Sequence, residues 1–189
     1  VVSVSGGETR WFNFPGDSRQ HYIARMDWAG NSKEVIIQRL NRLQNTNWVI
    51  LANHVNGKTR TIMIDRDEAW LDVVDDLIWI KKGRYFSWIS ERDGWRRLYI
   101  VNRKNGKMRK ITKGRFDVIS IQAIDVARGW VYYIASPKDP AQRLLYRSRL
   151  MAVAGRNCSA GASMEPIVIS SLRTIAGPFI PGLLSVRHR

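Results

Sequence analysis

A repeat of about fifty residues is the feature that most limits how this chain can fold. The segment VNGKTRTI (55–62) returns as KNGKMRKI (104–111), so that Gly57 and Gly106 stand 49 residues apart. An earlier copy, SGGETRW (5–11), precedes the first by 50 residues. Regular spacing of this length indicates an architecture made of successive similar units, each of which needs its neighbours to bury its apolar faces.

The repeat covers whole units rather than a single turn. Trp28 aligns with Trp79, and WVIL (48–51) aligns with LYIV (98–101). Each unit alternates short segments of β-branched and aromatic residues with Gly, Asn-Gly or Asp-Gly, which is the pattern of strands joined by tight turns. The second unit predicts strands at about 76–81, 84–90, 96–102 and 107–112.

Turn residues and tryptophans are expected to build these units. Asn-Gly and Asp-Gly supply the positive φ angles of two-residue hairpins, so we expect such turns at Asp93-Gly94 and Asn105-Gly106. Large aromatic side chains fill the space between packed sheets. We therefore predict that four tryptophans pack between units: Trp28, Trp79, Trp88 and Trp130.

Four-stranded units of this length are typical of β-propeller blades. We predict an all-β fold with about three four-stranded blades, at about 20–66, 76–112 and 116–150, after a blade remnant at 1–14. A meandering β-sandwich is the alternative, but it does not account for the matched turn residues. Three blades cannot close a ring, and the chain does not begin with Met. We therefore expect 1–150 to be a partial propeller from a longer protein.

The sequence changes character after Leu150. Residues 151–189 lack strand alternation, and Met151-Ala152 stands where a third Asp-Gly-type turn is expected. If the reading frame is moved back by one nucleotide at Met151 and synonymous codons are chosen freely, the tail can encode an Asp-Gly turn and a Trp-bearing strand. We therefore expect 151–189 to be a frameshifted or disordered tail without native character, which the nucleotide sequence would test.

Composition narrows the function classes. The net charge of +15 suggests nucleic-acid binding, but the basic residues are dispersed and mixed with acidic ones, as the solvated face of a sheet requires. We therefore expect no nucleic-acid partner. The single cysteine, Cys158, excludes a disulfide within the chain and a cysteine-based zinc cluster. The three histidines are scattered, so we expect no metal site and no cofactor.

Several segments together carry a resemblance to a known family. They are SERDGWRRLYIVN (90–102), ITKGRFDVISI (111–121), VYYIAS (131–136) and LYRSRL (145–150). This series resembles the N-terminal propeller domain of the dipeptidyl peptidase IV family, serine peptidases of the prolyl oligopeptidase clan. The segment 24–51 resembles the preceding blade of the same domain, so that the resemblance covers about 20–150.

The resemblance implies an eight-bladed propeller packed on an α/β-hydrolase domain that removes X-Pro dipeptides from peptide N-termini. The family's catalytic Ser, Asp and His lie in the hydrolase domain, C-terminal to this stretch, and the chain contains no G-x-S-x-G elbow. We therefore expect no catalytic residue here. The implied partners are a peptide substrate with penultimate proline, bound through the catalytic domain, and a second copy in a full-length homodimer. The implied location is periplasmic, cell-surface or membrane-anchored.

The resemblance also points to one substrate contact, in a loop shortly after a tryptophan. Here that loop is WLDVV, Trp70 to Val74, which lacks an aromatic residue at the corresponding place. Trp70 and Val74 are the candidate substrate-binding residues of this loop. Because the aromatic residue is missing, core packing is the preferred interpretation of both. The pairs Asp67-Glu68 and Asp75-Asp76 are interpreted as solvated carboxylates, because the family's paired glutamates belong to an earlier blade.

The residues alone leave three functions open. The first is the substrate-gating propeller of a prolyl dipeptidyl peptidase, separated from its catalytic half. The second is a non-catalytic propeller that binds a protein partner through its loops. The third is a basic nucleic-acid-binding β protein, which would require salt-dependent binding to DNA or RNA.

Overall fold

The computed structural model describes residues 1–150 and the backbone of 165–166. Apart from those two residues, the expected frameshifted or disordered tail at 151–189 lies outside the described residues. Within the described part, no helix is long and apolar enough to cross a membrane. A single turn of 3-10 helix, Ser18–Gln20, precedes the first strand.

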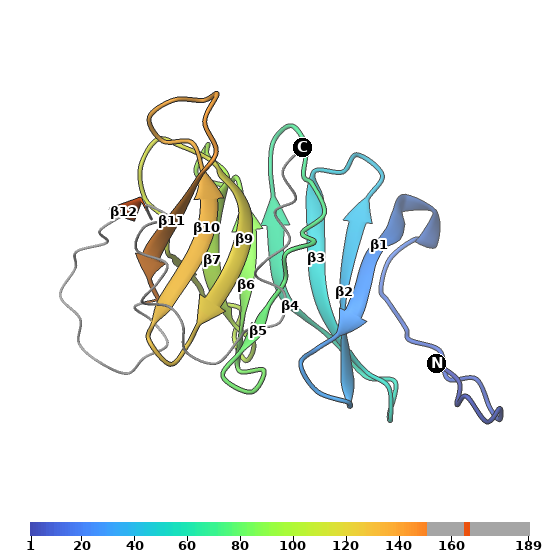
Figure 1. Cartoon of the computed structure of the whole chain (residues 1–189). Coiled ribbons are helices and arrows are strands. Elements are labelled where there is room, and N and C mark those ends of the chain that lie inside the picture. Colours follow the sequence, from blue (N-terminus) through green and yellow to red (C-terminus); the bar gives the residue numbers. More distant parts are fainter. Residues whose placement is uncertain (151–164, 167–189) are drawn as a thin grey trace, which may run out of the picture.

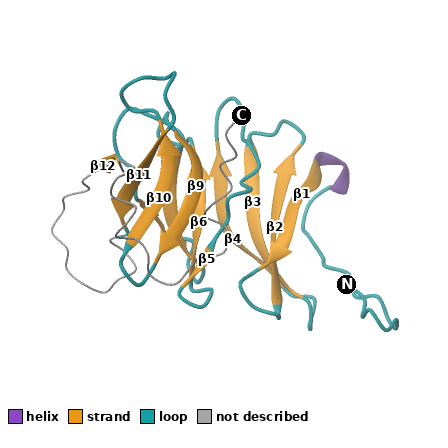
Figure 2. Ribbon diagram, viewed as in Figure 1, coloured by secondary structure: helices purple, strands orange, loops and turns teal. Residues whose placement is uncertain are grey.

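The chain forms three antiparallel sheets of four strands, which lie side by side in chain order (Figures 1 and 2). The first contains β1 (His21–Trp28), β2 (Glu34–Asn41), β3 (Thr46–Asn53) and β4 (Thr59–Arg66). The second contains β5 (Trp79–Ile80), β6 (Tyr85–Ser90), β7 (Arg97–Asn102) and β8 (Met108–Lys110). The third contains β9 (Val118–Asp125), β10 (Trp130–Ala135), β11 (Leu144–Arg149) and β12 (Glu165–Pro166). The prediction of an all-β fold with about three four-stranded blades is confirmed.

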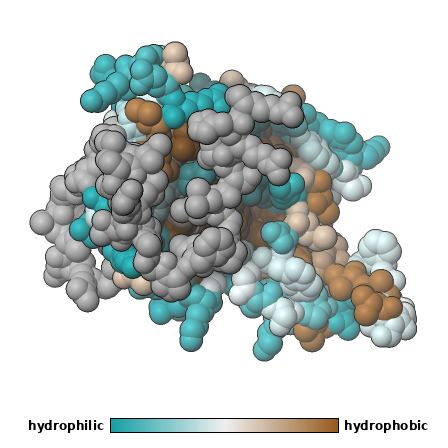
Figure 3. Space-filling view, viewed as in Figure 1, coloured by the Kyte–Doolittle hydropathy of each residue, from teal (hydrophilic) through white to brown (hydrophobic). Residues whose placement is uncertain are grey.

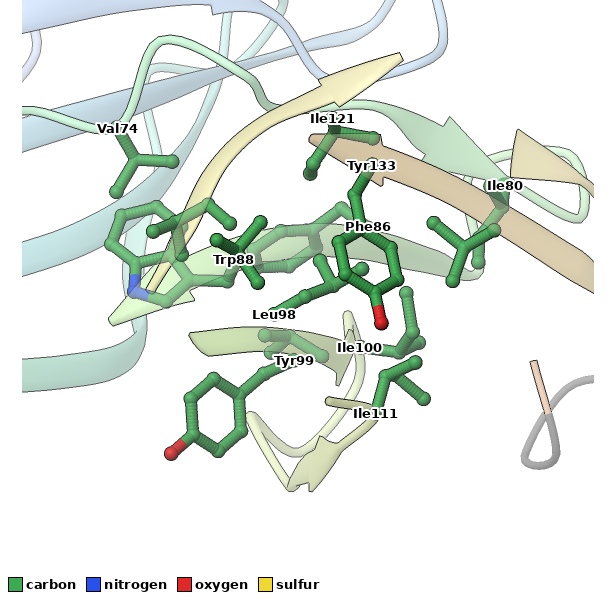
Figure 4. Packing of buried hydrophobic residues seen from close by; sticks show 14 of the residues in the cluster. Val74, Ile80, Phe86, Trp88, Leu98, Tyr99, Ile100, Ile111, Ile121 and Tyr133 are labelled. Carbon is green, nitrogen blue, oxygen red and sulfur yellow. The ribbon is translucent and has the colours of Figure 1, made fainter. Parts of the chain in front are cut away.

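One apolar core runs through all three sheets. Buried side chains of the first sheet, such as Ile62, belong to the same cluster as Phe86 and Trp88 of the second and Tyr133 of the third. Figure 4 shows Phe86, Trp88 and Tyr133 in this cluster. Phe86, Trp88 and Tyr133 are completely shielded from solvent. Because neighbouring sheets share this core, each blade depends on the next for its burial.

The repeated Asn-Gly segments form longer loops than the sequence predicts. The Asn102 N–H donates to the Lys107 carbonyl at 3.0 Å, which leaves four residues, 103–106, in the β7–β8 loop. Within it Gly106 has a φ of +68°, whereas Asn105 does not take a positive φ. The prediction of two-residue turns is therefore wrong. The Asn102 side chain accepts the Lys104 N–H at 2.8 Å, and this bond stabilises the wider loop.

The β7–β8 loop also joins the second blade to the first. Gly106 lies against β4 so closely that a Cβ atom there would stand 2.0 Å from the Ile62 carbonyl oxygen. Arg60 of β4 donates hydrogen bonds to two carbonyls of the same loop, Arg103 at 2.9 Å and Lys104 at 3.4 Å. Only glycine fits this position, because it combines positive φ with close approach of two backbones.

An equivalent contact between successive units occurs one unit earlier. Arg10 donates to the carbonyl of His54 in the β3–β4 loop at 3.2 Å. Gly57 in that loop faces the Trp11 carbonyl oxygen, 3.5 Å from where a Cβ atom would lie. The glycines and arginines that define the sequence repeat therefore form contacts between successive units.

The four predicted inter-blade tryptophans have different environments. Trp88 is fully buried and bonds to the first sheet, and Trp79 packs on Gly30 of the first sheet, so the prediction is confirmed for both. It is wrong for Trp28, which is 53% exposed and packs edge-on against His54 in the β3–β4 loop of its own blade. Trp28 lies on β1, at the edge of that sheet. Trp130 lies beneath two arginine side chains of its own sheet.

Apolar side chains are exposed on the side of the molecule that carries the N-terminal segment and the first sheet (Figure 3). Large exposed ones in this part of the chain include Trp11, Ile23, Met26 and Trp28. A second, smaller buried cluster lies within this sheet, around Ile37 and Ile50, and Phe12 and Phe14 pack against it.

Replacing Gly106 with alanine should destabilise the protein far more than the same change at Gly94. Both residues have positive φ, +68° and +77°, which costs an L-residue about 1–2 kcal/mol. Space around Gly94 is open, whereas a Cβ atom at Gly106 overlaps Ile62 and adds roughly 1–3 kcal/mol of overpacking. Urea unfolding of the two variants measures the difference. Equal midpoints would contradict the close contact between Gly106 and Ile62.

Candidate functional site

A shallow cleft opens between the first and second sheets, where the chain passes from β4 to β5. Its cavity volume is about 20 Å³, room for about one water molecule. The candidate residues Trp70 and Val74 both line it. Its other lining residues are Asn47, Asp65, Leu71, Asp72, Val73, Trp88, Ile89, Ser90, Glu91 and Arg96.

Two glutamines of the first blade, Gln38 of β2 and Gln44 of the β2–β3 loop, hold the Trp70–Val74 segment in place. The Gln38 side chain donates to the Val74 carbonyl at 2.7 Å and accepts the Val74 N–H at 3.0 Å. The Gln44 carbonyl accepts the Leu71 N–H at 2.7 Å, and its side-chain oxygen accepts the Trp70 indole N–H at 2.7 Å. The segment is therefore fixed at both ends, although it belongs to no strand.

The two candidate residues differ in exposure. Val74 is buried and points toward the Trp88 ring in Figure 4, so the core interpretation is confirmed for it. Trp70 is 56% exposed, so the core interpretation is wrong for Trp70. Its indole N–H is bonded to Gln44, which keeps the ring at the surface rather than in the core.

Asp65 of β4 is the polar centre of the contact between the sheets. This buried carboxylate accepts the Trp88 indole N–H at 2.7 Å and the Ser90 hydroxyl at 3.0 Å. Arg92 completes the group with a 2.6 Å ion pair to Asp65. Every donor comes from β6 or the loop that follows it, so that one aspartate ties the second blade to the first. Sequence analysis missed Asp65; the signal was an acidic residue directly after the apolar run IMI (62–64).

The loop after β6 is anchored on its far side by Asp93. Lys110 of β8 lies 2.5 Å from the Asp93 carboxylate, and Arg97 lies 3.6 Å from it. The hydrogen bond from Lys110 lowers the pKa of Asp93 below its ordinary value. The motif SERDGW therefore supplies Ser90 and Arg92 to one anchor and Asp93 to the other.

Acidic groups surround the mouth of the cleft. Burial raises the pKa of Glu91, and the carboxylates of Asp117, Asp72 and Asp67 raise it further, while Arg96 opposes the shift. A local excess of negative charge therefore exists on a chain whose net charge is +15. In the described part, no three His, Cys, Asp or Glu side chains converge as metal ligands would.

Comparison with known families decides where this fold belongs. A family model described as "Dipeptidyl peptidase IV (DPP IV) N-terminal region" matches residues 1–170. The chain belongs to this family. The resemblance carried by the SERDGW and ITKG segments is thereby confirmed.

Similar proteins bear dipeptidyl peptidase names. A "probable dipeptidyl peptidase 4" of Aspergillus clavatus is 30% identical over 132 residues, 66% of this chain and 17% of that protein. Its counterpart in Neosartorya fischeri is 28% identical over 138 residues, 69% of this chain and 18% of that protein. An "inactive dipeptidyl peptidase 10" of Mus musculus is 24% identical over 185 residues, 87% of this chain and 23% of that protein.

Solved structures agree with the family assignment. The crystal structure of Porphyromonas gingivalis dipeptidyl peptidase 4 superposes with a TM-score of 0.70 at 25% identity, covering 84% of this chain and 21% of that one. The chain thus spans about a fifth of the length of the relatives it matches.

Replacing Asp65 with alanine should cost about 3–5 kcal/mol of unfolding free energy, because it leaves the Arg92 charge and the buried Trp88 indole N–H without their acceptor. Asp75→Ala is the matched control. Asp75 pairs with Arg25 at 2.9 Å, but both side chains are more than half exposed, and such pairs contribute about 0–1 kcal/mol. Calorimetric melting of both variants tests this; similar losses of stability would contradict the role given to Asp65.

Proposed function

We propose that this chain is part of the propeller domain of a dipeptidyl peptidase IV-type serine exopeptidase that releases X-Pro dipeptides. In that setting the blades restrict access to the active site and contribute binding energy away from the scissile bond. They supply no bond-making chemistry. The observation that carries the proposal is the family match over residues 1–170. Full-length homodimerisation is part of the same proposal.

The groups in the cleft support a binding role over a catalytic one. A serine nucleophile needs a neighbouring base that is free to take its proton. Ser90 donates instead to Asp65, whose two carboxylate oxygens are already engaged by Trp88 and Arg92. No histidine lines the cleft.

We further propose that Trp70, rather than Val74, is the residue of this segment that meets substrate. Trp70 presents an exposed aromatic ring whose orientation is set by Gln44. Val74 is buried, and its backbone is bonded to Gln38. A substitution at Val74 would therefore act through packing and not through direct contact.

A non-catalytic interaction propeller is the second candidate function. The similarity to the "inactive dipeptidyl peptidase 10" of Mus musculus, over 87% of this chain, is the observation that favours it. The product of the whole gene separates the two candidates. Hydrolysis of Gly-Pro p-nitroanilide by that product would establish the peptidase, and a folded product without turnover would establish the alternative.

Purified chain 1–189 should not hydrolyse Gly-Pro or Ala-Pro p-nitroanilide, because the nucleophile, base and oxyanion donors are proposed to lie in another domain. The measurement is release of p-nitroaniline, with an active dipeptidyl peptidase as positive control. Turnover that co-purifies with the folded chain would refute the proposal that these blades lack catalytic groups.

Trp70→Ala in the whole-gene product should raise KM for a dipeptidyl substrate about three- to tenfold and leave kcat nearly unchanged, as expected when a binding contact remote from the reacting atoms is lost. Val74→Ala should instead lower the melting temperature. Steady-state kinetics and thermal melts of both variants test the distinction. A fall in kcat for Trp70→Ala at constant KM would overturn the assigned role.

A further inference from the structure

The floor of the cleft contains a buried acceptor without a donor. Asn47 of β3 is 1% exposed and lines the cleft, and its side-chain oxygen has no hydrogen-bond partner in the described structure. Leaving such an atom unpaired costs about 1–3 kcal/mol. Buried polar atoms nearly always have partners, so this oxygen indicates a donor that enters from the cleft.

The orientation of the Asn47 amide is fixed by its neighbours. Gln38 must present its oxygen to the Val74 N–H and its nitrogen to the Val74 carbonyl. The same Gln38 oxygen accepts the Asn47 amide nitrogen at 3.1 Å. Turning the Asn47 amide over would place two oxygens face to face. The unpaired atom is therefore the oxygen, and the missing group is a donor.

The walls of the cleft combine negative charge with apolar surface. Asp72 and Glu91 line it, and Asp67 and Asp117 act electrostatically on Glu91. Trp70 offers an exposed ring in the same wall, next to the buried side chains of Leu71 and Val74. A ligand that satisfies both parts carries a positive charge at the end of an apolar stem.

The two arginines near the cleft are already engaged. Arg92 is paired with Asp65 at 2.6 Å. Arg96 donates to the carbonyls of Val118 at 3.3 Å and Ile119 at 2.7 Å. Of the four carboxylates, Asp72 and Glu91 line the cleft together with Arg96. Asp67 and Asp117 act electrostatically on Glu91, and the remaining negative charge favours a cation.

We propose that this cleft is a binding site for the side chain of a lysine residue in a peptide or protein ligand. The lysine ammonium donates to the Asn47 oxygen and lies among the carboxylates of Asp72 and Glu91. Its methylene stem lies along Trp70 and Leu71, with a cation–π contribution from the indole. An ammonium is compact and has several donors, which suits a cavity of about 20 Å³ better than a planar guanidinium does. The proposal does not depend on the parent protein being a peptidase.

Nuclear magnetic resonance of the full chain with ¹⁵N-labelled tryptophan tests the site directly. The Trp70 indole signal, assigned with Trp70→Phe, should shift on titration with Nα-acetyl-lysine N-methylamide at low ionic strength. The Nζ-acetylated ligand and the norleucine analogue should produce no comparable shift.

A response to norleucine as large as that to lysine would overturn the proposal, since it would leave only apolar contact. An equal response to glycine N-methylamide would overturn the assignment to lysine by showing that any ammonium suffices. Absence of any shift with the lysine ligand would also overturn the proposal, because water alone would then satisfy the Asn47 oxygen.

Charge-matched variants give an independent test. Glu91→Gln and Asp72→Asn should each weaken lysine binding about three- to fivefold, the loss expected for one partly exposed charge contact. Glu68→Gln removes the same charge from a neighbouring residue that does not line the cleft, and should leave the affinity unchanged. Equal weakening by all three variants would show that overall charge, not this cleft, holds the ligand. Retained dispersion of the other indole signals confirms that each variant is folded.

Discussion

The close approach of the β7–β8 loop of the second blade to strand β4 of the first is the contact on which this structure depends. Gly106 lies against the Ile62 carbonyl, and Arg60 binds two carbonyls of the loop that contains Gly106. The same arrangement joins Arg10 to the His54 carbonyl one unit earlier. A single four-stranded sheet leaves both apolar faces exposed, so its burial depends on how closely the next sheet can approach. Glycines and arginines at a spacing of about fifty residues make that approach possible at two successive contacts, Gly57 with Arg10 and Gly106 with Arg60.

The cleft is a consequence of the same packing. Once the second sheet lies against the first, Asp65 at the end of β4 meets the indole and guanidinium donors of Trp88 and Arg92. The segment that connects β4 to β5 then passes over the contact between the two sheets, and Gln38 and Gln44 hold it there by hydrogen bonds. None of these residues is adjacent in sequence to those it binds. The site therefore exists only in the assembled pair of blades, and a change that separates the sheets would remove it.

Sequence reasoning succeeded for strands and family and was less accurate for individual side chains. Alternation of apolar residues and the recurring glycines predicted three four-stranded sheets, because side-chain period and turn chemistry are local properties. The Asn-Gly turns were assigned the wrong length, since Asn53 and Asn102 bond to loop N–H groups and open each hairpin to four residues. Trp28 and Trp70 were expected to be buried. Hydrophobicity does not reveal that one lies on an edge strand and that the other has its N–H bonded at the surface.

The sequence by itself determined the repeat, the strands it encodes and the family to which the chain belongs, because these depend on residue types at regular spacing. Tertiary structure alone decided which polar groups meet. It paired Asp65 with Trp88 across two sheets and left the Asn47 oxygen without a partner at the floor of a cleft lined by acidic residues. The reason is physical: hydrogen bonds and desolvation act over a few ångströms, and only packing brings residues 20 to 40 positions apart in the chain within that range.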